Sequence, residues 1–307
     1  MACGEKSLTH STKICRDESS PQIFAKNHKA VLAFGIGGVE NGELSRARSI
    51  AYREETQEYF ITDQANSRIQ IFNSHGKFVH TFGNNDLILP SYLVLHEQFL
   101  FVTDWGWLGY SLFKYEISSL QMVKRIGKNG FDPLIDYNVL RKPAIAPNYN
   151  LYVPDNNNNR ICIFTQNLEF VQDIKSTGLI SPVDITFHKE HMYVLTNFGT
   201  HCVHIFNFNG EIIESILTRS ELDCGMQVRF PSSFLIASDS NIIISDLVDH
   251  SIKIFDPTAK FLLYKIGGEG NEFGYFFYPK GIFLTSKGEL IVISMNERYG
   301  VQIFEFV

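Results

Sequence analysis

Residues that could do chemistry are plentiful in this sequence, but the usual catalytic arrangements are absent from it. The chain holds 10 His, 5 Cys and 33 Asp or Glu. A metal enzyme needs several convergent His or carboxylate ligands, and a serine hydrolase needs a motif such as Gly-x-Ser-x-Gly. His188 and His191 flank a predicted turn, His201 and His204 share one predicted strand, and Asp184 is the clearest acid on a predicted inner strand. We therefore expect no catalytic residue, no metal, no cofactor and no enzymatic activity.

The acidic residue with the clearest spacing recurs in six segments that align without gaps. Each segment ends with an apolar residue and Phe, and a marker position lies nine residues before that Phe. The segments are ITDQANSRIQIF (61–72), VTDWGWLGYSLF (102–113), VPDNNNNRICIF (153–164), LTNFGTHCVHIF (195–206), ISDLVDHSIKIF (244–255) and ISMNERYGVQIF (293–304). An acid that recurs with the period of a repeat is expected to serve a structural role in each copy.

We predict that each marker acid stabilises the turn that follows it. The carboxylate would accept backbone N–H groups of that turn, as an Asx-turn does. The Asn three residues on tolerates left-handed backbone geometry, and the Arg two further on can pair with an acidic or carbonyl group. The predicted structural turn residues are Asp63, Asn66, Arg68, Asp104, Asp155, Asn158, Arg160, Asn197 and Asp246.

The elements around each marker read as four short strands, which we name a to d. A Pro and an alternating run usually precede the segment, the segment itself supplies strands b and c, and a turn with another alternating run follows. The closing Phe residues are spaced 41 to 51 residues apart. No helical period interrupts the strands, and four antiparallel strands in each such unit are typical of propeller blades.

The two ends of the chain supply one blade together. The sixth unit stops at its strand c, and Ala30–Gly35 matches the strand-d pattern of Phe78–Gly83. We therefore predict an all-β fold: a six-bladed β-propeller of four-stranded antiparallel blades, closed by the N-terminal strand Ala30–Gly35, which completes the last blade. Residues 1–29 form a flexible polar tail in this prediction, and residues 30–307 form the propeller.

These residues resemble the NHL repeat, as found in the propellers of tripartite-motif (TRIM-NHL) proteins. Blade one shows the second half of the repeat, from Asp63, Asn66 and Arg68 to Phe72, and blade six shows the first half in 267–273 and 279–282. Blades two, four and six depart from the pattern, because Gly109, Cys202 and Gly300 replace the Arg and Met295 replaces the Asp. The resemblance implies substrate recognition within ubiquitin-ligase machinery. The chain shows no RING or B-box pattern for the ligase chemistry.

Composition indicates where in the cell the protein is expected and whether it contacts a membrane. The chain has 307 residues and a net charge of −6. It contains no run of 18 apolar residues, so the sequence predicts no membrane span. The first 29 residues lack the apolar stretch of a secretory signal, and the five Cys form no Cys-x-x-Cys pair. We expect a cytoplasmic, monomeric protein without membrane contact.

The predicted functional surface is the face that carries the b–c turns, where a protein or peptide would bind. The only two Trp residues of the chain both fall in one b–c turn, and Trp is enriched at binding hot spots. The predicted partner-binding residues are Trp105, Trp107, Tyr110, Phe198, Arg298 and Tyr299.

Two alternatives remain open at this stage. An RNA-binding propeller would use a local basic arc over blades six and one, made of Arg46, Arg48, Arg68, Lys280 and Arg298. Against it, residues 30–307 hold 22 Lys and Arg against 30 Asp and Glu, a net charge of −8. The further alternative is a metal-dependent lyase or hydrolase of the six-bladed type, which the scattered His residues do not favour.

Overall fold

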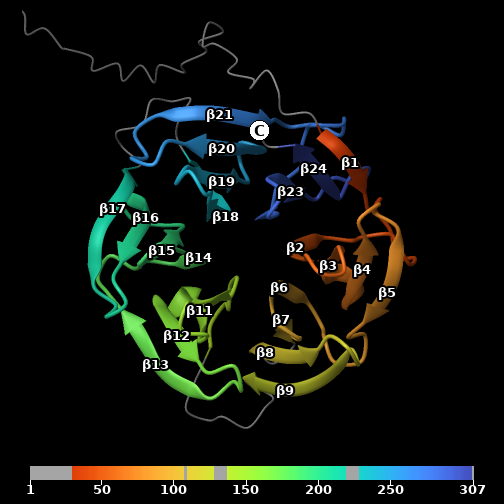
Figure 1. The fold of residues 1–307 in the computed structure, drawn as a ribbon, viewed down its shortest axis with the longest axis horizontal. Helices are drawn as coiled ribbons and strands as arrows, with labels where there is room; N and C mark the ends of the chain where they lie inside the picture. The colour runs from red at the N-terminus through yellow and green to blue at the C-terminus, as the bar shows by residue number, and fades with distance from the viewer. Residues whose placement is uncertain (1–29, 107–108, 128–136, 219–227, 306–307) are drawn as a thin grey trace, which may run out of the picture.

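Six four-stranded antiparallel sheets follow one another around a ring in the computed structural model, which describes residues 30–106, 109–127, 137–218 and 228–305 (Figure 1). Blade one contains β2 (Ala47–Arg53), β3 (Glu58–Asp63), β4 (Arg68–Asn73) and β5 (Phe78–Phe82). Blade two contains β6 (Pro90–His96), β7 (Phe99–Gly106), β8 (Gly109–Glu116) and β9 (Gln121–Gly127). Blade three contains β10 (Ala144–Ile145), β11 (Leu151–Asp155), β12 (Arg160–Phe164) and β13 (Phe170–Lys175).

The remaining blades have the same order from the axis outwards. Blade four contains β14 (Pro182–His188), β15 (His191–Thr196), β16 (His201–Phe206) and β17 (Ile212–Thr218). Blade five contains β18 (Pro231–Ile236), β19 (Ile242–Asp246), β20 (Ser251–Phe255) and β21 (Leu262–Gly267). Blade six contains β22 (Gly281–Leu284), β23 (Glu289–Ile293), β24 (Val301–Glu305) and β1 (Ala30–Phe34).

The ring closes as the sequence predicts. Strand β1 pairs antiparallel with β24, with Phe34 opposite Val301 and Ala30 opposite Phe304. Figure 1 shows the red N-terminal strand beside the blue C-terminal strands. The predicted six-bladed fold is therefore confirmed. The predicted tail, residues 1–29, lies outside the described residues.

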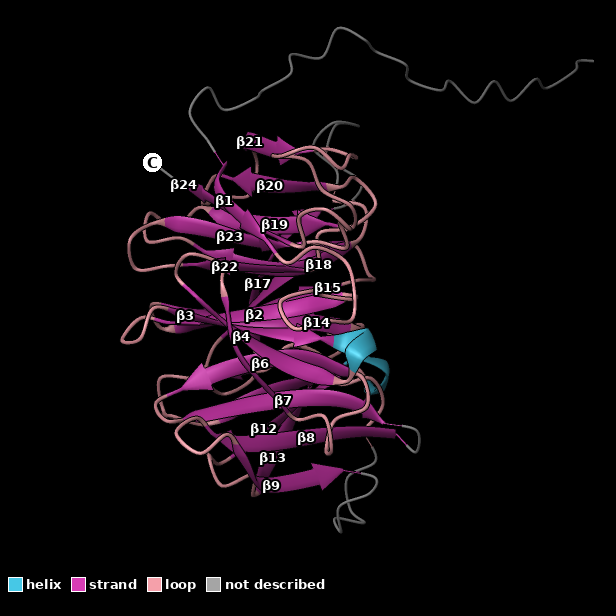
Figure 2. Cartoon of the chain, turned by 90° about the vertical axis from the view of Figure 1, so that its right-hand side faces the viewer, coloured by secondary structure: helices cyan, strands magenta, loops and turns pink. Residues whose placement is uncertain are grey.

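Two single-turn 3₁₀ helices lie in b–c connections, where the sequence predicted plain turns. They are η1 (Gln64–Asn66) in blade one and η2 (Asn156–Asn158) in blade three. The helical turns in Figure 2 mark the side of the ring that we call the b–c face. None of the helices in the described ranges is long and apolar enough to cross a membrane.

The core lies between neighbouring blades. The Phe that closes each strand c is at most 1% exposed in every blade, and Phe72 packs on Phe34 with ring centroids 5.1 Å apart. Burying such a side chain stabilises a fold by about 1.5 to 3 kcal/mol. These inter-blade layers hold each strand a at the axis of the ring. They therefore also position the side chains of the first residues of strand a.

Candidate functional site

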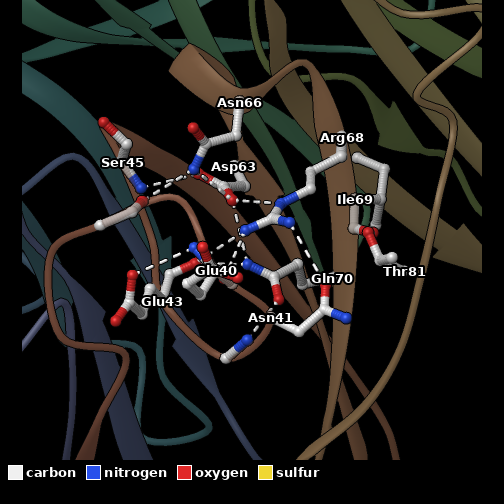
Figure 3. Close-up of polar contacts among 12 residues, drawn as sticks. Glu40, Asn41, Glu43, Ser45, Asp63, Asn66, Arg68, Ile69, Gln70 and Thr81 are labelled. Carbon is white, nitrogen blue, oxygen red and sulfur yellow. Dashed lines mark hydrogen bonds and ion pairs between the residues drawn. The ribbon is translucent and has the colours of Figure 1, made fainter.

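In blades one, two, three and five the marker carboxylate holds the loop that leads into the blade, as Figure 3 shows for Asp63. Asp63 is fully buried, and its Oδ1 accepts the backbone N–H of Ser45 at 2.7 Å. Its Oδ2 accepts the Nε–H of Arg68 at 2.7 Å and an amide N–H of Gln70 at 2.9 Å, while Asn66 donates to both oxygens. Asp63 therefore ties strand c to the d–a loop, which connects the outer strand of one blade to strand a of the next.

The other marker acids make equivalent contacts, and they correct the sequence prediction. The backbone donors, at 2.8 to 3.1 Å, are Ile88 and Leu89 for Asp104, Asn138 for Asp155, and Arg229 and Phe230 for Asp246. The predicted Asx-turn is wrong, because these N–H groups belong to the d–a loop and not to the b–c turn. The left-handed residues are Ser67 and Asn159, each one place after the predicted Asn66 and Asn158.

The cation beside the carboxylate varies between blades. Arg160 pairs with Asp155 at 2.8 Å in blade three, as Arg68 does with Asp63 in blade one. Blade five instead uses Lys253, which is 1% exposed and lies 3.0 Å from Asp246. In blade four Asn197 is buried, and its N–H donates to Ser181. The acids at the marker position are thus hydrogen-bonded and buried, which assigns them to structure.

Strand a starts irregularly in four of the six blades, and this places side chains at the axis. The pairing of strands a and b shifts register at the first residues of β2, β6, β14 and β18. A hydroxyl of strand b accepts the freed N–H in three of them: Thr62 from Ser49, Thr103 from Tyr92 and Ser245 from Ser233. Bulges of this kind re-aim side chains.

A cluster of cations gathers where these strands begin, and we call it the mouth cluster. It consists of Arg48, Tyr92, Arg141, Lys142, Asp184, Ser233 and Lys280, which come from all six blades. The Nζ of Lys142 lies 3.1 Å from Asp184, and the hydroxyl of Ser233 donates to the same carboxylate at 2.7 Å. Among its described residues the cluster therefore holds four cations and one carboxylate, and Lys142 alone is paired with that carboxylate.

Tyr92 lies at the centre of the unpaired cations. It is 2% exposed, its hydroxyl accepts an N–H of Arg141 at 3.3 Å, and the Arg48 guanidinium carbon lies 5.4 Å from its ring centroid. Burial alone would raise the pKa of Tyr92, but Arg48, Arg141 and Lys280 lower it to about 8. The pKa of Lys280 falls to about 8 because burial disfavours its charge and because Arg48 and Arg141 repel it.

The central channel continues from this cluster as an apolar cavity of about 480 Å³ between the six inner strands. Its walls include Leu93 to Leu95, Ile185 to Phe187 and Phe234 to Ile236. Lys142 is the single charged residue among the described residues that line it. A second cavity of about 480 Å³ lies on the b–c face, where Arg46 and Ala47 of blade one face Ser294 and Met295 of blade six.

An aromatic pair of an exposed Trp105 and a half-buried Tyr110, which we call the aromatic platform, lies on the b–c face of blade two. The ring of Trp105 stacks on Tyr110 with centroids 5.9 Å apart and an interplanar angle of 7°, and Trp105 is 49% exposed. Strand pairing continues past Asp104 to Gly106 opposite Gly109, so paired backbone supports both rings. Burial raises the pKa of Tyr110. The positive charges of Arg141 and Arg48 partly offset this rise, so the platform lies beside the mouth cluster.

The other predicted partner-binding residues lie on other blades of the same face. Phe198 is 58% exposed in blade four. Arg298 is exposed in blade six, and its guanidinium carbon lies 5.7 Å from the ring centroid of Tyr299. Trp107 lies outside the described residues. Blades one, three and five separate these groups from one another, so they form three places rather than one patch.

The predicted RNA-binding arc does not form one surface. Arg68 is 6% exposed and its guanidinium is taken up by Asp63 and by the carbonyls of Glu40 and Glu43, so its assignment to RNA contact is wrong. Arg48 and Lys280 belong to the mouth cluster. Arg46 and Arg298 alone stand exposed at the surface.

Metal ligation has no evident site in the described part of the chain. No group of three or more His, Cys, Asp or Glu residues there is arranged to hold an ion. His204 is buried, with Nδ1 2.7 Å from the hydroxyl of Ser215, and burial lowers its pKa to about 4 with a smaller effect from His201. The Nε2 of His204 is buried without a hydrogen-bond partner among the described residues, and no further His, Cys or carboxylate group in those residues joins it in a metal-binding arrangement.

The arrangement defines the chain as a six-bladed β-propeller with a cationic channel mouth. A streptogramin B lyase is similar at 12% identity over 91% of this chain and 97% of that one, with a TM-score of 0.63. A protein of unknown function from Bacteroides thetaiotaomicron VPI-5482 has a TM-score of 0.67 at 13% identity, over 91% of this chain and 75% of that one. Virginiamycin B lyase from Staphylococcus aureus has a TM-score of 0.61 at 12% identity, over 92% and 99% of the two chains.

These similarities establish the fold alone, because the identities are low. No family model and no curated protein sequence matches the chain. The similarity to NHL repeats therefore stays a prediction from the residues themselves.

Proposed function

We propose that this propeller is a non-enzymatic recognition scaffold that binds a protein or peptide on its b–c face. The observation that carries the proposal is the aromatic platform. Trp105 leaves half its surface in water although a neighbouring ring is stacked on it, and apolar surface of this kind is typical of a contact site. By its resemblance to TRIM-NHL propellers, the partner would be a substrate presented to ubiquitin-ligase machinery.

The rigidity of the platform supports this function. Trp105 and Tyr110 are directly opposite one another on β7 and β8. Because the backbone of both residues is already ordered, a partner that covers the rings pays little further conformational entropy. Their position beside the mouth cluster gives the face both an apolar contact and a positive charge.

A peptide-display selection tests the proposal. Wild-type protein should enrich a set of peptide sequences from a random library, and Trp105→Ala should lose that enrichment. Phe261→Ala is the matched control, because Phe261 is 65% exposed but lies in a c–d turn on the opposite face. Enrichment that survives Trp105→Ala would show that the platform is not the contact site. Salt-sensitive retention of a random RNA pool without peptide enrichment would instead support RNA binding.

A further inference from the structure

The mouth cluster holds more positive charge than the described residues compensate. Its single carboxylate, Asp184, is fully buried and already accepts the Lys142 amine, the Ser233 hydroxyl and the N–H groups of Ile185 and Phe234. Arg48, Arg141 and Lys280 form no ion pair with any carboxylate in the described ranges. Like charges brought together from separate blades repel one another in a place that water only partly screens.

The hydrogen bonds of Arg48 and Arg141 likewise indicate that the cluster lacks a negatively charged acceptor. The Nε atoms of Arg48 and of Arg141 are both buried and have no hydrogen-bond partner among the described residues. Buried polar groups are normally hydrogen-bonded, so each unpartnered donor needs an explanation. The neighbouring phenol of Tyr92 accepts an N–H from Nη1 of Arg141, so it does not satisfy either Nε.

We propose that the mouth cluster is an oxyanion-binding site, in which Arg48, Arg141 and Lys280 bind a carboxylate or phosphate group of a ligand. A guanidinium presents several N–H donors in a plane that matches the oxygens of both groups. An anion seated there would supply the missing acceptor and offset the mutual repulsion of the cations. The hydroxyl of Tyr92, which accepts an N–H of Arg141, would donate its own proton to the anion.

This inference goes beyond the proposed function and stands on different residues. The aromatic platform could bind a neutral peptide, and the mouth cluster could bind a free anion without a peptide. Trp105→Ala should therefore leave anion binding unchanged, so the failure of either proposal would not look like failure of the other.

Tyr92 provides the readout for the test. The ultraviolet absorbance of tyrosinate follows its titration, and Tyr92→Phe identifies which part of the signal belongs to Tyr92. The groups that face this phenol are Arg48, Arg141 and Lys280, with Tyr110 nearby. A bound anion opposes loss of the phenol proton, so inorganic phosphate should raise the pKa of Tyr92 above about 8 in a saturable way. Sodium chloride at equal ionic strength is the control for screening.

Two probes and two variants complete the design. Inorganic phosphate and acetate are titrated separately, and the one that saturates at lower concentration identifies the group that the site prefers. Arg141→Gln should weaken binding by about tenfold or more, whereas Arg46→Gln, an exposed cation on the same face, should not change it.

Thermal unfolding provides an independent measurement. Phosphate should raise the melting temperature of wild type and of Tyr92→Phe more than chloride does. If neither phosphate nor acetate shows a saturable effect beyond chloride, or if Arg141→Gln retains the full effect, the proposal is overturned. If Arg141→Gln does not fold, the comparison of phosphate, acetate and chloride on the wild type decides by itself.

Discussion

The pKa of Lys280 responds directly to the positive charge gathered at the channel mouth. Its amine faces Arg48, Arg141 and Tyr92, and its pKa in the folded protein is about 8 instead of 10.5. The unfolded chain therefore keeps this proton at pH values where the folded protein has already released it. Because the unfolded state binds more protons between about pH 8 and pH 10.5, the free energy of unfolding should rise with pH across that window.

The size of the effect follows from the change in pKa. Each pKa unit corresponds to about 1.4 kcal/mol, so the fall from 10.5 to about 8 corresponds to about 3 kcal/mol. Lys280 is partly exposed and water screens some of the interaction, so we expect about 2 kcal/mol. Tyr92 has an effect of the same sign, because its pKa is also lowered to about 8. Tyr59 and Tyr115, whose pKa values are raised, oppose both only above pH 10.0.

Urea unfolding of wild type and Lys280→Met from below pH 8 to pH 10 checks this prediction. The stability of wild type should rise relative to that of Lys280→Met by about 2 kcal/mol. Lys260→Met removes an exposed lysine from a c–d turn and should follow the wild-type curve. Parallel curves for wild type and Lys280→Met would refute the charge crowding on which the oxyanion site is argued.

Three further predictions concern the framework. Arg68→Met should lower the free energy of urea unfolding by about 3 to 5 kcal/mol, because it leaves a buried carboxylate unpaired, while Arg46→Met should change it by less than about 0.5 kcal/mol. A chain that lacks Ala30–Phe34 should lose cooperative thermal unfolding, because blade six then has an open edge, whereas removal of the residues before it should leave the transition intact. Gly267→Ala should lower the melting temperature and cost about 1 to 3 kcal/mol, because Gly267 has φ +84° and an added Cβ would overlap the ring of Phe276.

The sequence predicts the ring well because its determinants are local and repeated. The alternation of apolar residues and the closing Phe determine which strand faces which blade, and they recur at a nearly constant spacing. The match between Ala30–Gly35 and the other outer strands was enough to predict closure, because the sixth unit has no outer strand of its own. Because the pattern recurs in six units, six individually weak patterns together predict the same blade structure.

The partners of the marker acids could not be predicted in the same way. Asp63 reaches Ser45, which lies in the loop before its blade, and that loop takes its position from the packing of two blades. An Asx-turn is the contact that short-range chain geometry favours, but the backbone N–H donors come from the preceding d–a loop instead, while Asn66 of the b–c turn donates through its side chain.

The mouth cluster was predicted only in part, for a related reason: the predicted basic arc contained Arg48 and Lys280 but not Tyr92 or Arg141. Arg48, Tyr92, Arg141 and Lys280 lie in different blades, and ring closure alone brings them together. The signal that could have found them is positional, since a basic residue stands at or just before the start of strand a in blades one, three and six. The net charge of −8 concealed this local excess, because it averages over a whole ring.

Recognition of a peptide by the b–c face can be measured as the dissociation constant of one selected peptide by isothermal titration. We expect Trp105→Ala to weaken binding by about thirtyfold or more, the loss expected at a hot-spot residue, while its thermal unfolding matches that of wild type. Phe261→Ala should bind within about twofold of wild type. If Trp105→Ala binds the peptide as tightly as wild type does, the aromatic platform is not the recognition site.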